Sequence, residues 1–328
     1  MLQSMYSGIS GMSASNQQLN VISNNIGNSQ TTAFNSSSVT FEDMFSQTVQ
    51  ASTAPTGSSG GINASQVGTG TKVQSINKNM NAGSNQATGR ALDNCISGNG
   101  FFILGRGTIG TGITVDQADH SAKSTTGTEL DYSRDGSFSL DAAHNIVNAG
   151  GSKLMGYALK DGTTTSIDDS GATTKVNFVA SSATVTAADT NLVPLVIPET
   201  IDGSKVSSYG IDQNGIITAT LADKRVAAIG QIALASFAND SGLNATGNNM
   251  YSVSTNSGSA VLKSGIGDTA NNNSEAFGTI LSGVLQASNV DLATEFTHMI
   301  EASKAFQASG KIITTGDTIL QTIINLKQ

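Results

Sequence analysis

The chain has 328 residues, enough for two or three domains with a substantial buried core. Charged side chains make up 12% of it, about half the usual fraction, and it has 36 Gly and no Trp, which is typical of a β-rich protein with many turns or of a surface that meets other subunits through uncharged polar groups. The formal net charge of −8, with no Lys/Arg cluster, argues against nucleic acid as a partner, and no stretch approaches the ~18 consecutive apolar residues of a membrane-spanning helix.

Residues 2–26 are predicted to form a helix that ends at Gly27. No Asp, Glu, Lys, Arg or His precedes Glu42, so the faces of this helix can be buried without desolvating a charge. Its apolar residues follow a heptad-like series, with Asn16 in the gap: Leu2, Met5, Ile9, Met12, Leu19 and Ile26. Gly8 and Gly11 each cost about 1 kcal/mol relative to Ala. We therefore expect this helix to be unfolded when alone and ordered when a partner covers it.

The segment 51–61 is predicted to be a flexible connector, and a period of two begins near Ile62. Three turns, Asp135–Gly136, Gly150–Gly151 and Asn214–Gly215, are each predicted to join two neighbouring strands. A Thr/Ser/Asp-rich stretch, 160–208, interrupts this β region. We interpret it as a small inserted outer β domain.

The C-terminal segment, from about Leu281 to Lys327, is predicted to be a second helix. Six of its apolar residues follow an unbroken step of seven: Leu285, Leu292, Met299, Phe306, Ile313 and Leu320. Phe296 and Ile300 lie beside this line, so the helix has apolar surface beyond one seam. The two terminal helices could pair within one monomer as an ordinary two-helix tail. The surplus apolar surface favours a further partner, namely other copies of the chain.

The predicted fold class is therefore α+β and mainly β. The terminal helices pair as a coiled-coil-like inner domain, and discontinuous β domains lie outside it. The expected domains are 1–45 (helix and linker), 62–159 (main β domain, first part), 160–208 (inserted domain), 209–263 (main β domain, second part) and 279–328 (C-terminal helix).

Residue types that serve in catalysis or in metal and phosphate binding are present, but their spacing does not form a recognisable site. The histidines have no metal-ligand spacing, the Gly-x-Gly segments lack the flanking pattern of phosphate loops, and the paired carboxylates have no apolar neighbours that would raise a pKa. These are His120, His144 and His298, Gly68–Gly70 and Gly98–Gly100, and Asp168–Asp169. Cys95, the only cysteine, lies in an apolar run and is predicted to be buried. We expect no enzyme, catalytic residue, cofactor or metal. A secreted glycan-binding or glycan-cleaving β protein stays a remote alternative.

Motifs at both ends and in the β region resemble those of the bacterial flagellar rod and hook protein family. They are Ser23–Phe34, Leu92–Phe102, Tyr132–Phe138, the stretch from Phe237 to Gly258, Ser288–Ile300 and Lys311–Asp317. Within them the family motif residues are Asn24, Asn25, Thr32, Phe34, Asn289, Val290 and Asp291. The chain departs from the family pattern at Gly27 and Ala33, where Ala and Gly are usual, at Ser303–Lys304, where Gln–Arg is usual, and at Phe306, where Tyr is usual.

Within the family, the sequences of Asp291–Thr297 and Ile323–Lys327 resemble those of hook subunits more than those of distal rod subunits. The resemblance implies a helical homopolymer with the packed terminal helices around a channel, at the bacterial flagellum outside the cell. It also implies export by the flagellar type III apparatus, which fits the absence of a signal peptide. The implied partners are the distal rod protein, a hook cap and hook–filament junction proteins, with no nucleic acid and no membrane insertion.

Overall fold

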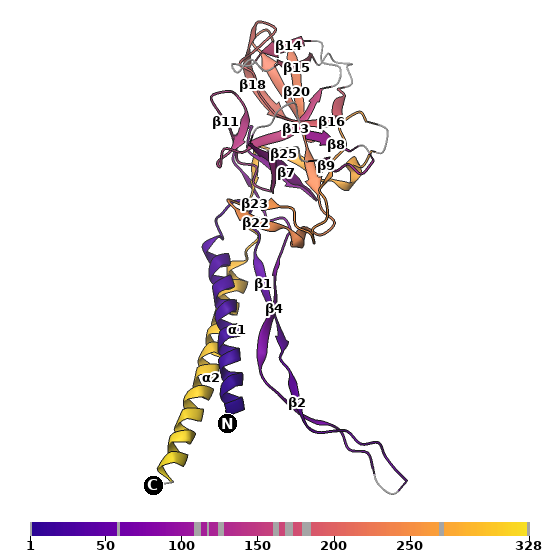
Figure 1. Ribbon diagram of the computed structural model, residues 1–328. Coiled ribbons are helices and arrows are strands. Elements are labelled where there is room, and N and C mark those ends of the chain that lie inside the picture. The colour runs from indigo at the N-terminus through magenta and orange to yellow at the C-terminus, as the bar shows by residue number, and fades with distance from the viewer. Residues whose placement is uncertain are drawn as a thin grey trace. The chain divides into compact units, whose positions relative to one another are not determined.

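The computed structural model describes residues 2–57, 60–107, 113–116, 118–123, 128–159, 164–167, 173–178, 185–268 and 272–326 (Figure 1). Its contacts divide the chain into two compact units. The first, which we call the terminal unit, contains Met1–Gln30, Asn35–Asn79 and Asn289–Gln328. The second, the β unit, contains Thr31–Phe34 and Met80–Ser288. The protein is mainly β with two long helices that pack together, which confirms the predicted fold class.

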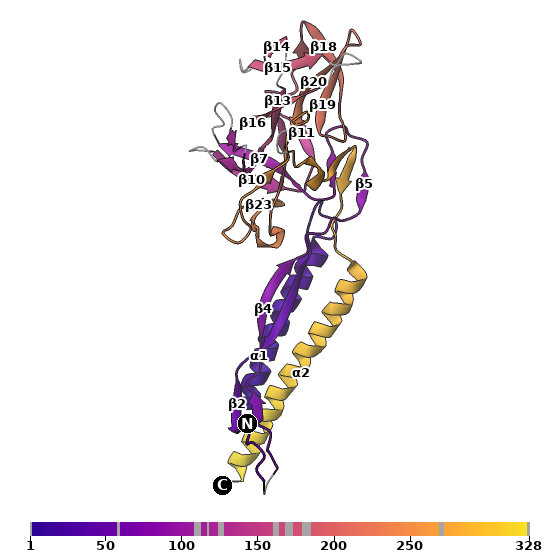
Figure 2. The ribbon, with the colours of Figure 1, turned by 90° about the vertical axis from the view of Figure 1, so that its right-hand side faces the viewer.

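The terminal unit consists of two helices and a long β-hairpin. The helices are α1, Leu2–Gly27, and α2, Leu292–Asn325, and they lie side by side in both views (Figures 1 and 2). Strand β1, Ser37–Asp43, pairs with β4, Thr71–Lys78, in antiparallel register. The same hairpin continues through β2, Ser46–Gln50, and β3, Ser65–Gly68. Helix α1 matches its predicted bounds to within one residue.

The described residues of the segment predicted to be a flexible connector, 51–57 and 60–61, lie at the loop end of this hairpin. Thr53 and Ile62 form an antiparallel bridge across it. Residues 62–79 belong to the terminal unit, whereas the sequence pattern predicts that they belong to the main β domain. Alternation of apolar and polar residues identifies a strand, but it does not indicate which unit the strand belongs to.

The predicted start of the C-terminal helix at Leu281 is wrong. Residues 279–286 form β25, Thr279–Ser282, and β26, Val284–Gln286, which pair with β6, Asn94–Ser97, and β5, Asn85–Ala87. Gly283 separates the two strands in a left-handed conformation, with φ +74°. The helix begins only after Asp291, whose carboxylate accepts the Ala293 N–H at 3.0 Å as an N-cap. Leu285 therefore lies in β26, opposite Gln86, and is not part of a helix seam.

The β unit is one network of paired strands around a core. Its other strands are β7 Phe101–Gly107, β8 Ile113–Val115, β9 Ala122–Lys123, β10 Thr128–Ser133, β11 Phe138–Leu140, β12 Ile146–Asn148, β13 Lys153–Leu159, β14 Thr164–Ile167, β15 Thr173–Phe178, β16 Ala187–Pro194, β17 Thr200–Ile201, β18 Ser204–Ile211, β19 Ile216–Leu221, β20 Val226–Ile232, β21 Leu234–Ser236, β22 Asn244–Gly247, β23 Met250–Ser252 and β24 Val261–Leu262. Short 3₁₀ helices lie at Asp240–Gly242 and Ser274–Ala276. Strand β7 is buried on both faces because Phe102 and Leu104 pack in one hydrophobic cluster while Phe101 and Ile103 pack in another.

Two of the three predicted turns join the strands expected. The Gly150–Gly151 turn connects β12 to β13, and Asn214–Gly215 connects β18 to β19. The strands on either side of Asp135–Gly136 do not pair with each other. Strand β10 pairs with β7 and β23, and β11 pairs with β12.

The stretch 160–208 is not a separate outer domain over its second half. Strand β16 pairs with β13, where Tyr157 lies opposite Leu192. Leu192 and Ile201 are fully buried in the same clusters as β7 and β13. Because most residues of the stretch are polar, its composition does not indicate that it contributes side chains to the core. Of its first half, the structure describes the hairpin of β14 and β15.

Candidate assembly interface

Helices α1 and α2 pack antiparallel along a heptad seam. The buried or half-buried positions of α1 include Met5, Gly8, Met12, Ser15, Leu19, Ile22 and Ile26. Those of α2 include Glu295, Met299, Ala302, Phe306, Ser309, Ile313, Gly316 and Leu320. Both sets advance by alternating steps of three and four, which is the spacing of a coiled-coil interface. In each helix one line of the seam is apolar and the other is made mostly of small or polar residues.

The small residues let the two helices approach closely. A methyl group on Gly8 would lie 3.2 Å from Ile313 Cγ1 and 3.3 Å from the Ser309 carbonyl oxygen. A methyl group on Gly316 would lie 3.0 Å from Met5 Cγ. On sequence alone, Gly8 is only a cost to the stability of the helix. The structure gives it a packing role, and the seven-residue repeat of small side chains at 302, 309 and 316 is the signal that could have revealed it.

The structure brings together part of the predicted packing set. Met5, Met12, Leu19 and Ile26 lie on the seam of α1, and Met299, Phe306, Ile313 and Leu320 lie on that of α2. Ile9 does not, because it is 51% exposed, and Leu292, in the first turn of α2, is 42% exposed. Leu2 belongs to α1, but its side chain lies outside the described residues. The role of any of these residues between subunits stays a prediction.

Helix α2 has exposed apolar side chains on both sides of the seam. Phe296 and Ile300, which we call the exposed stripe, are 50% and 62% exposed and each follow a seam residue. Ile312 and Ile319, which are 48% and 45% exposed, lie on the other side of the seam, next to α1. A groove of about 420 Å³ opens on that side, lined by Ser4 of α1 and by residues of α2 that include Ile312 and Ile319. An exposed apolar stripe on a paired helix is a surface that favours a further partner.

A second face of α1 packs against the hairpin of its own chain. Ser10 Oγ accepts the Thr71 N–H at 3.3 Å, and a side chain on Gly70 would collide with Ser10. Ala14, in the same stretch of α1, is 5% exposed. The helix is thus enclosed on two sides within one chain, by α2 and by the hairpin, before any other copy of the chain contacts it.

Asn25 joins the three elements of the terminal unit. Its side-chain amide donates to the Ser37 carbonyl at 2.8 Å and to Glu295 Oε1 at 2.9 Å, and its oxygen accepts the Ser37 N–H at 3.0 Å. The residue is 1% exposed, so these bonds satisfy a buried polar group. This motif residue therefore fixes the end of α1 to β1 and to the start of α2.

Asn289 and Asp291 perform the corresponding task before α2. Asn289 Oδ1 accepts the Ser36 N–H at 2.7 Å, and its amide donates to the Asn79 carbonyl at 2.8 Å. The Thr294 hydroxyl and the backbone N–H groups of Ala293 and Thr294 hold the pKa of Asp291 below its usual range. A carboxylate at this position also suits the positive end of the helix dipole.

The other motif residues have simpler positions. Asn24 is exposed, while Val290 and Phe34 are half-buried. In the β unit, the Thr32 carbonyl accepts the Asn249 amide at 2.7 Å. Ala33, which departs from the family pattern, has φ +53° and is 2% exposed. Glycine adopts this conformation without strain, which gives the usual family residue a physical reason.

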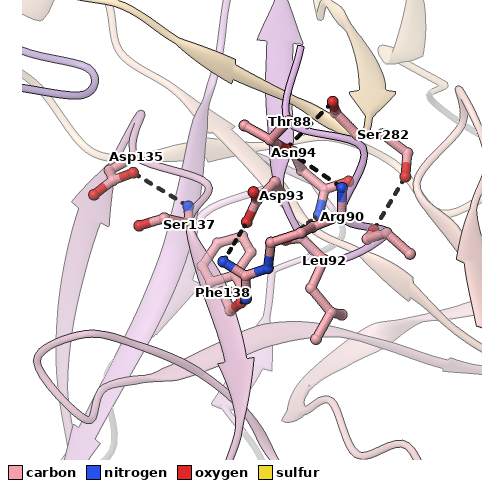
Figure 3. Close-up of polar contacts among 11 residues, drawn as sticks. Thr88, Arg90, Leu92, Asp93, Asn94, Asp135, Ser137, Phe138 and Ser282 are labelled. Carbon is pink, nitrogen blue, oxygen red and sulfur yellow. Dashed lines mark hydrogen bonds and ion pairs between the residues drawn. The ribbon is translucent and has the colours of Figure 1, made fainter. Parts of the chain in front are cut away.

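Two internal motifs meet in the β unit around a buried carboxylate (Figure 3). Asp93 is 1% exposed and lies 3.3 Å from Arg90 Nη1, while Arg90 Nη2 donates to the Phe138 carbonyl. Asp135 accepts the Ser137 N–H at 3.1 Å in the turn before Phe138 (Figure 3). The two motifs are joined directly by the backbone, because the Asn94 N–H donates to the Gly136 carbonyl at 3.0 Å, and this gives both motifs a structural role.

The described residues contain no group of three or more His, Cys, Asp or Glu side chains that could hold a metal ion. Cys95 is buried, as predicted, and burial raises the pKa of its thiol, with Arg134 acting in the opposite direction. Neither α1 nor α2 has the length and hydropathy that a membrane crossing requires.

The terminal helices bury little apolar surface in one chain. Among their described side chains, the buried hydrophobic ones are Ala14, Ile22 and Ala302. Each buried CH₂ group contributes about 0.8 kcal/mol, whereas ordering a residue costs about 1–2 kcal/mol. The seam alone is therefore a weak source of stability for helices of 26 and 34 residues.

Comparisons with known proteins match both ends of the chain. A family model described as flagellar basal body rod FlgEFG protein C-terminal matches residues 281–326, and one described as flagella basal body rod protein matches residues 5–34. The flagellar basal-body rod protein FlgG of Bacillus subtilis is 34% identical over 328 residues, covering 100% of both chains. The flagellar hook proteins FlgE of Borreliella burgdorferi and Escherichia coli are 28% and 26% identical, covering 100% and 97% of this chain and 100% and 98% of theirs. The two family models therefore match the segments that contain α1 and α2.

Proposed function

The chain belongs to the bacterial flagellar basal-body rod and hook protein family, and from this we propose that it is the structural subunit of the flagellar hook. In this proposal, copies assemble into a flexible hollow tube that transmits torque from the rod to the filament. The members of the family are structural components of the flagellum, and the chain shares that role.

The exposed apolar stripe of α2 is the observation that carries the assembly proposal. Its residues, Phe296 and Ile300, are 50% and 62% exposed in the described part of the chain, and they lie on a helix that buries too little to be stable alone. Packing the stripe against other copies would remove it from water and order both helices together. Because α1 has no charged side chain, enclosing it requires no charge to be removed from water.

The assignment to the hook is supported by two C-terminal segments, Asp291–Thr297 and Ile323–Lys327, whose sequences resemble those of hook subunits. A specific observation favours the distal rod as a second candidate. The alignment with the rod protein FlgG has 328 positions, the chain's own length, while that with the Borreliella burgdorferi hook protein has 468, a difference of 140. A hook built from this chain would therefore have smaller outer domains than that relative.

The proposed mechanism divides the work between the two units. The terminal units interlock through their helices and give the tube axial continuity. The β units contact each other through uncharged Ser, Thr and Asn side chains, whose weak contacts can slide as a bent tube rotates. Fixed ion pairs would oppose such sliding, and the low charged fraction of 12% suits it.

The proposed partners follow from the place in the flagellum. They are other copies of the chain, the distal rod protein, the hook cap and the hook–filament junction proteins. Export would use the flagellar type III apparatus without a cleaved signal peptide, and the finished tube would lie outside the cell.

Electron microscopy of the polymerised protein tests both parts of the proposal. Curved tubes are expected for a hook, whereas straight rigid shafts would assign the chain to the rod. Ile300→Ser, in the exposed stripe, should prevent tube formation, because a buried isoleucine contributes about 2–5 kcal/mol when lost from a packed contact. Glu301→Gln, at an exposed position next to it, is the control and should assemble. Normal assembly of Ile300→Ser would remove the stripe from the interface.

A further inference from the structure

The β unit contains a buried lysine at a cavity, lined by polar and apolar residues, that takes no part in the packing of α1 and α2. Lys263 follows β24 and is only 8% exposed. It lines a cavity of about 320 Å³, together with polar residues that include Asn214, Gln231, Asn272, Glu275 and Thr279. This volume falls at the small end of the range typical of ligand sites.

The wall of the cavity is held in place by two side-chain amides. Asn273 accepts the Ser264 N–H at 2.8 Å and donates to the Leu262 carbonyl at 2.8 Å, so it brackets Lys263 on both sides. Gln231, 2% exposed, accepts the Ile266 N–H at 2.8 Å and donates to the Asn214 carbonyl at 2.9 Å. A site with such a framework is formed before any ligand arrives.

The Lys263 ammonium is incompletely satisfied. It has three N–H donors, and its one hydrogen bond to the residues that the structure describes goes to the Gly278 carbonyl at 3.4 Å. None of the carboxylates that the structure describes forms an ion pair with it. Burial lowers the pKa of this amine, which shows that its charge lacks compensation. A buried cation is normally paired, so an anion in the cavity would restore the balance.

We propose that this cavity is a binding site for a carboxylate, held by the Lys263 ammonium. A single positive charge matches a monoanion better than a phosphate or sulfate dianion, and the exposed Glu275 carboxylate at the rim disfavours a second negative charge further. The amide and hydroxyl groups of Asn272 and Thr279 suit hydroxyl groups carried by the same ligand. The carboxylate can come from a small free hydroxylated acid or from a side chain of a neighbouring copy.

Binding to the full-length monomer tests the site. D-glucuronate should give a saturable calorimetric signal and raise the melting temperature, while D-glucose, which lacks the carboxylate, should give neither. Lys263→Met should weaken glucuronate binding by about tenfold or more. Lys205→Met, which removes a lysine with a 76% exposed side chain, should leave binding unchanged. Equal responses to both sugars, or undiminished binding by Lys263→Met, would overturn the proposal.

A second variant covers the case in which Lys263→Met fails to fold. Glu275→Gln removes an exposed carboxylate and should tighten glucuronate binding about twofold to fivefold at low salt. Unchanged or weaker binding would count against a carboxylate in this cavity.

The assembled tube identifies the source, and this arm alone rests on the proposed function. If a neighbouring copy supplies the carboxylate, the tube should no longer bind glucuronate that the monomer binds. If the ligand is a free acid, tube and monomer should bind it equally. Failure to form tubes would contradict the proposed function and leave the monomer measurement standing.

Discussion

At the residue scale, Asn25 holds the terminal unit together through three hydrogen bonds to two other elements. Asn25→Ala should leave the Ser37 backbone groups without partners, which costs about 1–3 kcal/mol. We expect the critical concentration for tube formation to rise between fivefold and about a hundredfold. Asn24→Ala, next to it and exposed, should change it little. Equal effects of the two variants would show that the hydrogen bonds of Asn25 are not needed for assembly.

The Asp291 cap predicts a pH dependence at the start of α2. Hydrogen bonds from the Thr294 hydroxyl and then from the Ala293 and Thr294 N–H groups lower the pKa of this carboxyl in the folded state. A lowered folded pKa stabilises the fold above the unfolded value of about 3.9, and this stabilisation is lost as the pH falls through the folded pKa.

Amide exchange at residues 293–296 of the assembled tube measures the cap. Protection there should be constant from pH 7 to about 5 and decrease below about pH 4. Asp291→Asn keeps a side-chain oxygen for the Ala293 N–H but does not titrate, so its profile should stay flat. The same acid-induced loss in both proteins would assign the effect to other groups.

At the scale of elements, the seam of α1 and α2 depends on close approach at Gly8. Gly8→Val should force its side chain against Ile313 and the Ser309 carbonyl, and overpacking of this kind costs about 1–3 kcal/mol. The midpoint temperature of tube dissociation, followed by light scattering, should fall by several degrees. Gly27→Val is the matched control, because no heavy atom lies within 4 Å of a methyl group there. A similar decrease for both variants would mean that close packing at Gly8 does not cause the effect.

The sequence was sufficient for α1 but not for α2. Helix α1 could be predicted because its apolar spacing, the terminal Gly27 and the absence of Pro all agree. The step of seven through Leu285 misled the prediction of α2, since the apolar pattern continues into β26 while Gly283 and the Asp291 cap set the true start. The other half of each seam was missed because small residues such as Gly8 and Ser309 carry no hydrophobic signal.

At the scale of the whole molecule, the two units should respond differently to deletion. Removing residues 1–27 takes away α1 and should prevent assembly, while the β unit, 80–288, keeps its core and stays folded. Removing residues 160–208 takes away Leu192, Leu195 and Ile201 from the buried clusters. Each such loss costs about 2–5 kcal/mol, and the three together are as large as the whole stability of a typical domain, about 5–15 kcal/mol.

Urea unfolding of the two deleted proteins, followed by near-ultraviolet circular dichroism, checks this difference. A cooperative transition is expected without residues 1–27 and none without residues 160–208. A folded β unit in the second protein would restore the interpretation of 160–208 as a separable outer domain, which the sequence composition suggested.

The most direct test compares amide exchange of the monomer with that of the assembled tube. We predict that residues 2–27 and 292–326 exchange rapidly in the monomer and become protected in the tube, while the strands of the β unit are protected in both. Helices already protected in the purified monomer, with no tubular particles at any concentration, would contradict the claim that these helices become ordered through assembly.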